Sequence, residues 1–233
     1  MADTEGVRGT PHELALLAGG PRAAVVVAVV SLHLRGAVEA GAPGTLLAVD
    51  GDAGRALPPL PPFERLEQEG VPDEMRAPYL ESAVYHCLDE PSDLRYLLRH
   101  VDVRWALAEL RVGLADAGML RYPLLLGPTT AARRRLGTLR KAFPLPASRH
   151  GLPDERKLIA VALHGEPALR TLVPRFALRA GLTERVSLRQ KSLLRHSPRS
   201  GASGGAGHVY CGGGGGGSCG GGGGGGGCGG GSN

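Results

Sequence analysis

The strongest pattern along the chain is an uninterrupted apolar stretch near the N-terminus. Ala23 to Val30 include no polar side chain, and a helix that is apolar on every side belongs in a protein interior. Pro21 suits the first position of such a helix, because the backbone N–H that proline lacks has no helical partner there. Gly36 ends it. We therefore predict a helix over 21–35 at the centre of the core.

A shorter helix is predicted immediately before this one. Thr10, Pro11 and Glu13 fit a capping box, in which the hydroxyl and the carboxylate each accept a hydrogen bond from a backbone N–H near the helix start. Gly19 and Gly20 end the helix, because glycine adopts the left-handed conformation that closes helices. The two predicted helices are therefore joined by a very tight turn.

Two short runs beyond these helices predict a β-hairpin. Residues 37–40 and 45–49 flank a four-residue, glycine-containing connection, 41–44. Two helices and a hairpin are the parts of a winged helix, a fold often used on DNA, in which 21–35 would be the reading helix. This helix offers few side chains to phosphates or bases, namely Arg22, Ser31, His33 and Arg35. We favour a packing role for it and keep DNA binding as the alternative.

The rest of the chain is predicted to be helical, after a proline-rich connector. The prolines of 58–62 make 51–72 an extended spacer, because each disfavours helix in the residue before it. Beyond it the pattern predicts helices at 78–88, 91–99, 102–117, 129–142, 154–164 and 167–180, the last divided at Pro174.

A weak internal repeat relates the two halves. When Ala24 is aligned with Ala106, Gly36 falls opposite Gly118, and each helix runs through its glycine into a predicted strand, in the second half Tyr122–Leu126. Two similar helix-to-hairpin units explain this pattern. Any amphipathic helix that ends at glycine before a strand gives it too, so both explanations stay open.

The predicted fold is mainly α with small β-hairpins, in tandem helix-helix-hairpin units that resemble winged helices. The first unit is 10–50, the connector is 51–72, and a second helical unit with a short hairpin is 73–186. A tail follows at 187–233, first basic and then rich in glycine and cysteine. Its glycine run, 201–233, has very little apolar surface to bury and is expected to be disordered.

No segment predicts export or a membrane span. Residues 1–5 are polar with no apolar run behind them, unlike a signal peptide. The longest apolar run, Ala23 to Leu34, has about a dozen residues, whereas a spanning helix needs about twenty. We expect a cytoplasmic protein.

Charge is distributed in blocks. Residues 51–93 carry ten acidic and three basic side chains, and 121–149 carry seven basic and no acidic ones. Such blocks either neutralise each other in the fold, steer association with a partner, or are two solvated faces. The body is nearly neutral, because four of the five net positive charges lie in 187–233. This does not favour nucleic acid as a partner.

The candidate catalytic motifs before the tail lack the residue spacing that their chemistry requires. His12-Glu13 begins like the helix of a zinc metalloprotease, but Leu16 stands where the second histidine is needed. His86 and Cys87 are adjacent, so on a helix their side chains point about 100° apart and make a poor nucleophile–base pair.

The tail contains a possible zinc set. His208, Cys211, Cys219 and Cys228 have the right donor types, but structural zinc sites usually have much closer cysteine pairs. We therefore predict no catalytic, cofactor-binding or metal-binding residues, no cofactor, and a protein that is not an enzyme.

Several segments resemble one group of known sequences. They are Glu13–Arg22 with its LAGGP core, Leu34–Gly36, Gly41–Thr45, Ala160–Gly165 and Val173–Ala177, together with the glycine- and cysteine-rich tail. They are similar to an uncharacterised bacterial family of "domain-containing membrane proteins". The resemblance covers nearly the whole chain. It implies membrane contact, and it implies no particular activity or catalytic residue.

The functional expectation is a non-enzymatic cytoplasmic adaptor or regulatory module that binds another protein. The partner is not identifiable from the sequence. A winged-helix DNA-binding regulator is the alternative.

Overall fold

The first helix, α1, spans Pro11–Leu34 and begins as predicted. The backbone N–H of Thr10 donates to Glu13 Oε2 at 2.7 Å, and the backbone N–H of Glu13 donates to Thr10 Oγ1 at 3.3 Å. This reciprocal pair is the predicted capping box. It fixes the point at which the chain enters the core.

The predicted break between two helices is a kink inside α1. Gly20 has φ 77° and ψ −166°, outside the helical region, and Pro21 follows it. The two halves of α1 therefore meet directly at Gly20. The helix ends with Arg35 as its C-cap, and Gly36 follows with φ 77°. A side chain is strained at such a positive φ, which explains glycine at both positions.

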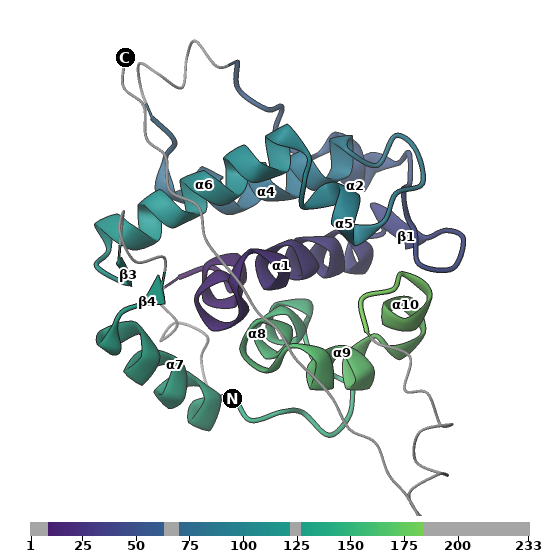
Figure 1. Cartoon of the computed structure of the whole chain (residues 1–233). Coiled ribbons are helices and arrows are strands. Elements are labelled where there is room, and N and C mark those ends of the chain that lie inside the picture. The colour runs from purple at the N-terminus through teal and green to yellow at the C-terminus, as the bar shows by residue number, and fades with distance from the viewer. Residues whose placement is uncertain (1–8, 63–69, 122–126, 184–233) are drawn as a thin grey trace, which may run out of the picture. The chain divides into compact units, whose positions relative to one another are not determined.

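The second half of α1 is the centre of the core, as predicted. Each residue of Ala24–Val30 is at most 7% exposed. In Figure 1, α1 lies between α4 (Asp73–His86) and α6 (Val101–Asp116) on one side and α8 (Asp154–His164) on the other, and it packs against all three. Helices from both predicted helical units therefore share one hydrophobic core.

Two antiparallel hairpins follow the two long helices. After α1, β1 (Val38–Ala40) pairs with β2 (Leu46–Ala48), with Val38 opposite Ala48. After α6, β3 (Leu120–Arg121) pairs with β4 (Gly127–Pro128). The predicted strand at 122–126 lies outside the described residues.

The C-terminal helices match the helices predicted from the sequence closely. They are α7 (Thr130–Ala142), α8, α9 (Glu166–Leu172) and α10 (Pro174–Arg179). Thr129 caps α7 through its side chain, which accepts from the backbone N–H of Ala132. Pro174 divides the last predicted helix in two, as expected.

Three predictions are corrected in the middle of the chain. The connector is not wholly extended, because Asp52–Arg55 form a short helix, α2, which Arg55 supports by pairing with Asp50 and Asp52. The helix predicted from Pro78 begins at Asp73, since two acidic residues in its first turn favour that start and Pro78 is accommodated inside it. The helix predicted at 91–99 is only α5, Leu94–Leu97.

The computed structural model describes residues 9–62, 70–121 and 127–183, of which 61% are helix and 7% strand. The mainly helical fold with small hairpins is thus confirmed. The described residues all belong to one compact unit, 1–186. The predicted tail lies outside the described residues.

The length of α1 corrects one expectation. Because helix continues on both sides of Gly20, α1 has 24 residues and a mean hydropathy of 1.9 in its most apolar window, enough by length and composition to cross a membrane. The core helix of a folded domain passes the same test. Here 67% of that window is buried inside the protein.

Candidate functional site

The kink of α1 opens a set of adjoining cavities. The first, about 600 Å³, is bordered by Gly19 and Arg22 together with residues of α5, α8 and α9. The second, about 800 Å³, shares Arg22 with the first. The third, about 450 Å³, shares Pro21 and Arg111 with the second. The three cavities therefore lie around the Gly-Gly-Pro break of α1.

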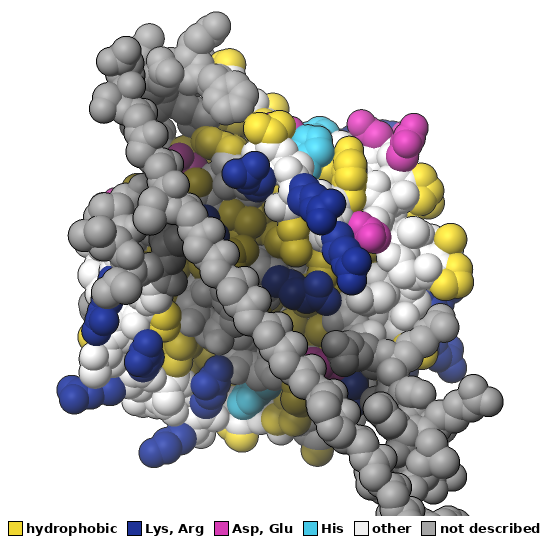
Figure 2. All heavy atoms as spheres, viewed as in Figure 1, with side chains coloured by type: hydrophobic (Ala, Val, Ile, Leu, Met, Phe, Trp, Pro, Cys, Tyr) yellow, Lys and Arg dark blue, Asp and Glu magenta, His cyan; other side chains and the backbone are white. Residues whose placement is uncertain are grey.

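We call the second cavity the arginine cleft. It lies between the start of the second half of α1 and one face of α6, and it combines basic with apolar side chains. In Figure 2, dark-blue Lys and Arg side chains lie beside yellow hydrophobic ones over α1 and α6. The lining residues are Pro21, Arg22, Leu98, Val101, Arg104, Trp105, Leu107, Ala108 and Arg111.

The apolar wall of the arginine cleft is unusually open to solvent. Val101, the first residue of α6, is 63% exposed. Trp105 is half-buried, and its ring packs in a tilted arrangement against that of Tyr79 on α4, with the ring centroids 6.0 Å apart. The tryptophan is therefore held in place while one part of it faces the cleft.

The three arginines of the cleft carry uncompensated charge. Arg22 and Arg104 are exposed and Arg111 is partly buried. Within the described part of the chain, none of the three forms an ion pair. The cleft lining contains no acidic residue. The arrangement therefore suits an anionic group bound next to an apolar one.

The charge blocks noted in the sequence stay apart. Among the described residues, no ion pair joins the acidic block 51–93 to the basic block 121–149. The acidic block pairs elsewhere, for example Asp73 with Arg76 at 2.6 Å. Arg133 and Arg134 on α7 point to solvent. Neutralisation of one block by the other is therefore not seen in this part of the fold.

His12, whose surrounding sequence resembles an incomplete metalloprotease motif, has a structural role. His12 is buried, and its Nε2 lies 3.3 Å from Glu81 Oε1 on α4, an ion-pair distance without hydrogen-bond geometry. Glu81 also pairs with Arg35 at the other end of α1. Burial alone would raise the pKa of Glu81, but the contact and charge of His12, helped by Ser31 and Arg35, lower it from 4.5 to about 2. Glu81 thus ties both halves of α1 to α4.

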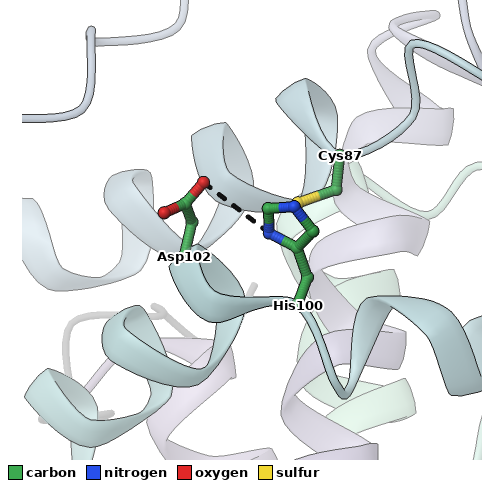
Figure 3. A group of neighbouring side chains, drawn as sticks. All are labelled: Cys87, His100 and Asp102. Atoms are coloured by element: carbon green, nitrogen blue, oxygen red, sulfur yellow. Dashed lines mark ion pairs between the residues drawn. The ribbon is translucent and has the colours of Figure 1, made fainter.

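As the sequence predicts, the side chains of Cys87 and His86 do not form a nucleophile–base pair. His86 is exposed, whereas Cys87 is buried. Cys87 lies instead beside His100 and Asp102, which come from the start of α6 (Figure 3). Burial, with the negative charges of Asp102 and Asp89, raises the pKa of the Cys87 thiol to about 12. The thiol is therefore protonated at neutral pH and is not an activated nucleophile.

Sequence reasoning missed both the arginine cleft and this cluster. The cleft has a readable signal, because Val101, Arg104, Trp105, Ala108 and Arg111 recur at the spacing of one helix face. The cluster has none, since contact between the end of α4 and the start of α6 depends on tertiary packing. The tail candidates, His208, Cys211, Cys219 and Cys228, lie outside the described residues.

Comparison with protein-family models, with curated proteins and with solved structures found no match. The resemblance to the bacterial family therefore stays a prediction.

Proposed function

We propose that this protein is a non-enzymatic module that binds an acidic segment of another protein in its arginine cleft. One observation carries the proposal: three guanidinium groups that have no acidic partner among the described residues lie beside an exposed apolar wall. It is the adaptor or regulatory role expected from the sequence, now with a docking surface and a chemical class of partner.

The chemistry of the lining selects this kind of partner. Guanidinium groups bind carboxylates through two parallel hydrogen bonds, so Arg104 and Arg111, about two turns apart on α6, can each take a Glu or Asp of a docked segment. Val101 and Trp105 then bury apolar side chains of the same segment. Tryptophan and arginine are also the residues that contribute most to the affinity of protein interfaces.

An amphipathic helix is the form of segment that fits best. The cleft residues lie along one face of α6, and a helix places its acidic and apolar side chains in rows at the same spacing. Nucleic acid matches the arginines but would leave Val101 and Leu98 facing a charged backbone. We therefore commit to a protein segment.

Two finer expectations from the sequence, the winged-helix-like units and the cytoplasmic location, form part of this proposal. Each long helix is followed by a hairpin, which supports two winged-helix-like units, and a cytoplasmic location accords with a module of this kind. The DNA-binding alternative would need a different reading helix, because Ala24–Val30 of α1 are buried. Membrane contact is implied only by the resemblance to the bacterial family.

Site-specific crosslinking in the native host tests the proposal. A photo-crosslinking phenylalanine analogue replaces Val101 at the cleft, and in a matched control it replaces Leu178, which is 49% exposed on α10. We expect position 101 to capture a protein segment rich in Glu or Asp and apolar residues. The charge-reversed double variant Arg104→Glu, Arg111→Glu should abolish that capture.

Three results would overturn the proposal. They are capture of nucleic acid from position 101, equal capture of the same protein from position 178, and capture that survives reversal of both arginines. Mass spectrometry of the crosslinked peptide distinguishes these outcomes from the expected one.

A further inference from the structure

The end of α4 and the start of α6 bring together three side chains that are metal ligands in other proteins. Cys87 is the C-cap of α4, His100 is the N-cap of α6, and Asp102 lies in the first turn of α6. One potential ligand atom from each lies within 4.8 Å of the other two. Figure 3 shows the sulfur of Cys87 close to the imidazole of His100, and a dashed line joins the ring to the carboxylate of Asp102.

His100 and Asp102 lie at ion-pair distance but make no hydrogen bond. His100 Nδ1 lies 3.6 Å from Asp102 Oδ2, too far for a hydrogen bond between nitrogen and oxygen. This nitrogen is shielded from solvent and has no hydrogen-bond partner in the described part of the chain. Two ligands about 2.0–2.1 Å from one tetrahedral zinc ion lie roughly 3.4 Å apart, close to the observed separation.

The charges around the thiol also favour a cation. Asp102 lies in one cluster with Cys87, whose side chain is buried. A carboxylate so near a buried sulfur supplies negative charge that a bound divalent ion would balance. The cluster is thus more than an isolated cysteine, since donor types, spacing and charge agree.

We propose that Cys87, His100 and Asp102 bind a zinc ion, with a fourth position left to water or to a ligand from outside. Thiolate, imidazole and carboxylate together match the mixed ligand preference of zinc. On binding, the Cys87 S–H bond breaks, the sulfur coordinates the metal, and the proton is released to solvent. The side chains of His100 and Asp102 are 28% and 33% exposed, which gives the ion a path from solvent.

This site does not depend on the proposed docking function, although the two share α6. His100 and Asp102 flank Val101, the strongly exposed valine of the arginine cleft. A metal that joins the end of α4 to the start of α6 would hold that edge of the cleft in place. Binding of metal and binding of an acidic segment are measured separately.

Cobalt is the probe, because a thiolate bound to Co²⁺ gives a near-ultraviolet charge-transfer band that Zn²⁺ removes by displacing it. The titration uses the full chain with Cys211→Ser, Cys219→Ser and Cys228→Ser, which leaves Cys87 as the one cysteine of four. We expect the band to saturate at one Co²⁺ per chain. Cys87→Ser should abolish it.

Two further variants keep the test independent of folding. His100→Asn and Asp102→Asn change partly exposed side chains, and each should weaken Co²⁺ binding by at least about tenfold, as loss of a ligand contact requires. His86→Asn, which changes the exposed neighbour of Cys87, is the matched control and should leave binding unchanged. Circular dichroism verifies that all variants are folded.

The proposal is overturned by either of two results. One is a titration without a thiolate band in the parent chain. The other is a band that persists at the same affinity in both His100→Asn and Asp102→Asn, which would show metal held by the thiol alone.

Discussion

Replacement of Glu81 by glutamine tests the account of how α1 is held in the fold. Glu81 is buried on α4 and contacts His12 and Arg35, which lie at opposite ends of α1. Glutamine keeps the shape of the side chain and one of its two acceptor oxygens but removes its charge. The variant therefore isolates the electrostatic tie between α1 and α4.

The magnitude follows from the pKa of Glu81. A fall from 4.5 to about 2 on folding corresponds to about 3 kcal/mol of stability, since one pKa unit equals about 1.4 kcal/mol. Arg35 is 44% exposed, so solvent screens part of its contribution. We expect Glu81→Gln to lower the free energy of unfolding by about 2–3 kcal/mol near pH 5.

The pH dependence gives the sharper test. The pKa is lower in the folded state than in the unfolded state, so the stabilisation is present above about pH 4.5 and is lost as the pH falls towards 2. The difference between wild type and Glu81→Gln should therefore shrink over this range. The exposed Glu39 provides the control, because Glu39→Gln should change little at any pH.

Urea unfolding followed by circular dichroism, at a series of pH values, measures this difference. Equal stability of wild type and Glu81→Gln near pH 5 would refute the reasoning. A difference that stays constant down to about pH 2 would refute it as well.

Three other changes test the core, the α4–α6 contact and the tail. Val29→Asp should unfold the protein at neutral pH, because Val29 is fully buried and has no room for a charged partner, and unchanged thermal melting would contradict this. Gly113→Ala should destabilise by about 1–2 kcal/mol, because a Cβ there collides with the guanidinium of Arg76, whereas Gly137→Ala in open space should stabilise slightly by helix propensity. Deletion of 201–233 should leave the melting temperature unchanged if the sequence-based expectation of disorder is right.

Local signals in the sequence predicted the N-terminal part of the fold well. The capping box at Thr10, the break at Gly20 and the hairpin after Gly36 depend on residues within a few positions of each other. Backbone conformation at such points is decided by local sterics and hydrogen bonding, which are legible in one sequence. The burial of Ala24–Val30 followed from composition alone.

Prediction was weaker where tertiary contacts outweigh local preference. Pro78 looked like a helix start, but it lies inside α4, whose packing against α1 and α6 outweighs the loss of one backbone hydrogen bond. The helix predicted at 91–99 is short, because Asp93 caps a single turn there. Propensity is a weak guide in such places.

The candidate sites were hardest to predict, because their residues meet only in the fold. Cys87 and His100 are far apart in sequence and come together because α4 packs against α6. The arginine cleft forms only where the second half of α1 lies beside one face of α6. Its stripe of Val101, Arg104, Trp105 and Ala108 was visible, but nothing local indicated that a cavity would lie over it.

A titration of Trp105 fluorescence tests the central claim most directly. Trp105 is the one tryptophan of the chain and it lines the arginine cleft. The probe is a short helical peptide with Glu on one face and Leu on another and without aromatic residues. A peptide with Gln in place of Glu is its control.

The account predicts a saturable change in Trp105 emission with the acidic peptide and a much weaker one with the Gln peptide. Arg104→Glu with Arg111→Glu should weaken binding by at least about tenfold, since each replaces an attraction by a repulsion. Arg133→Glu with Arg134→Glu, the same charge change on α7, should leave affinity nearly unchanged. No saturable response to the acidic peptide, or equal loss of affinity in both double variants, would contradict the claim that this cleft binds acidic segments.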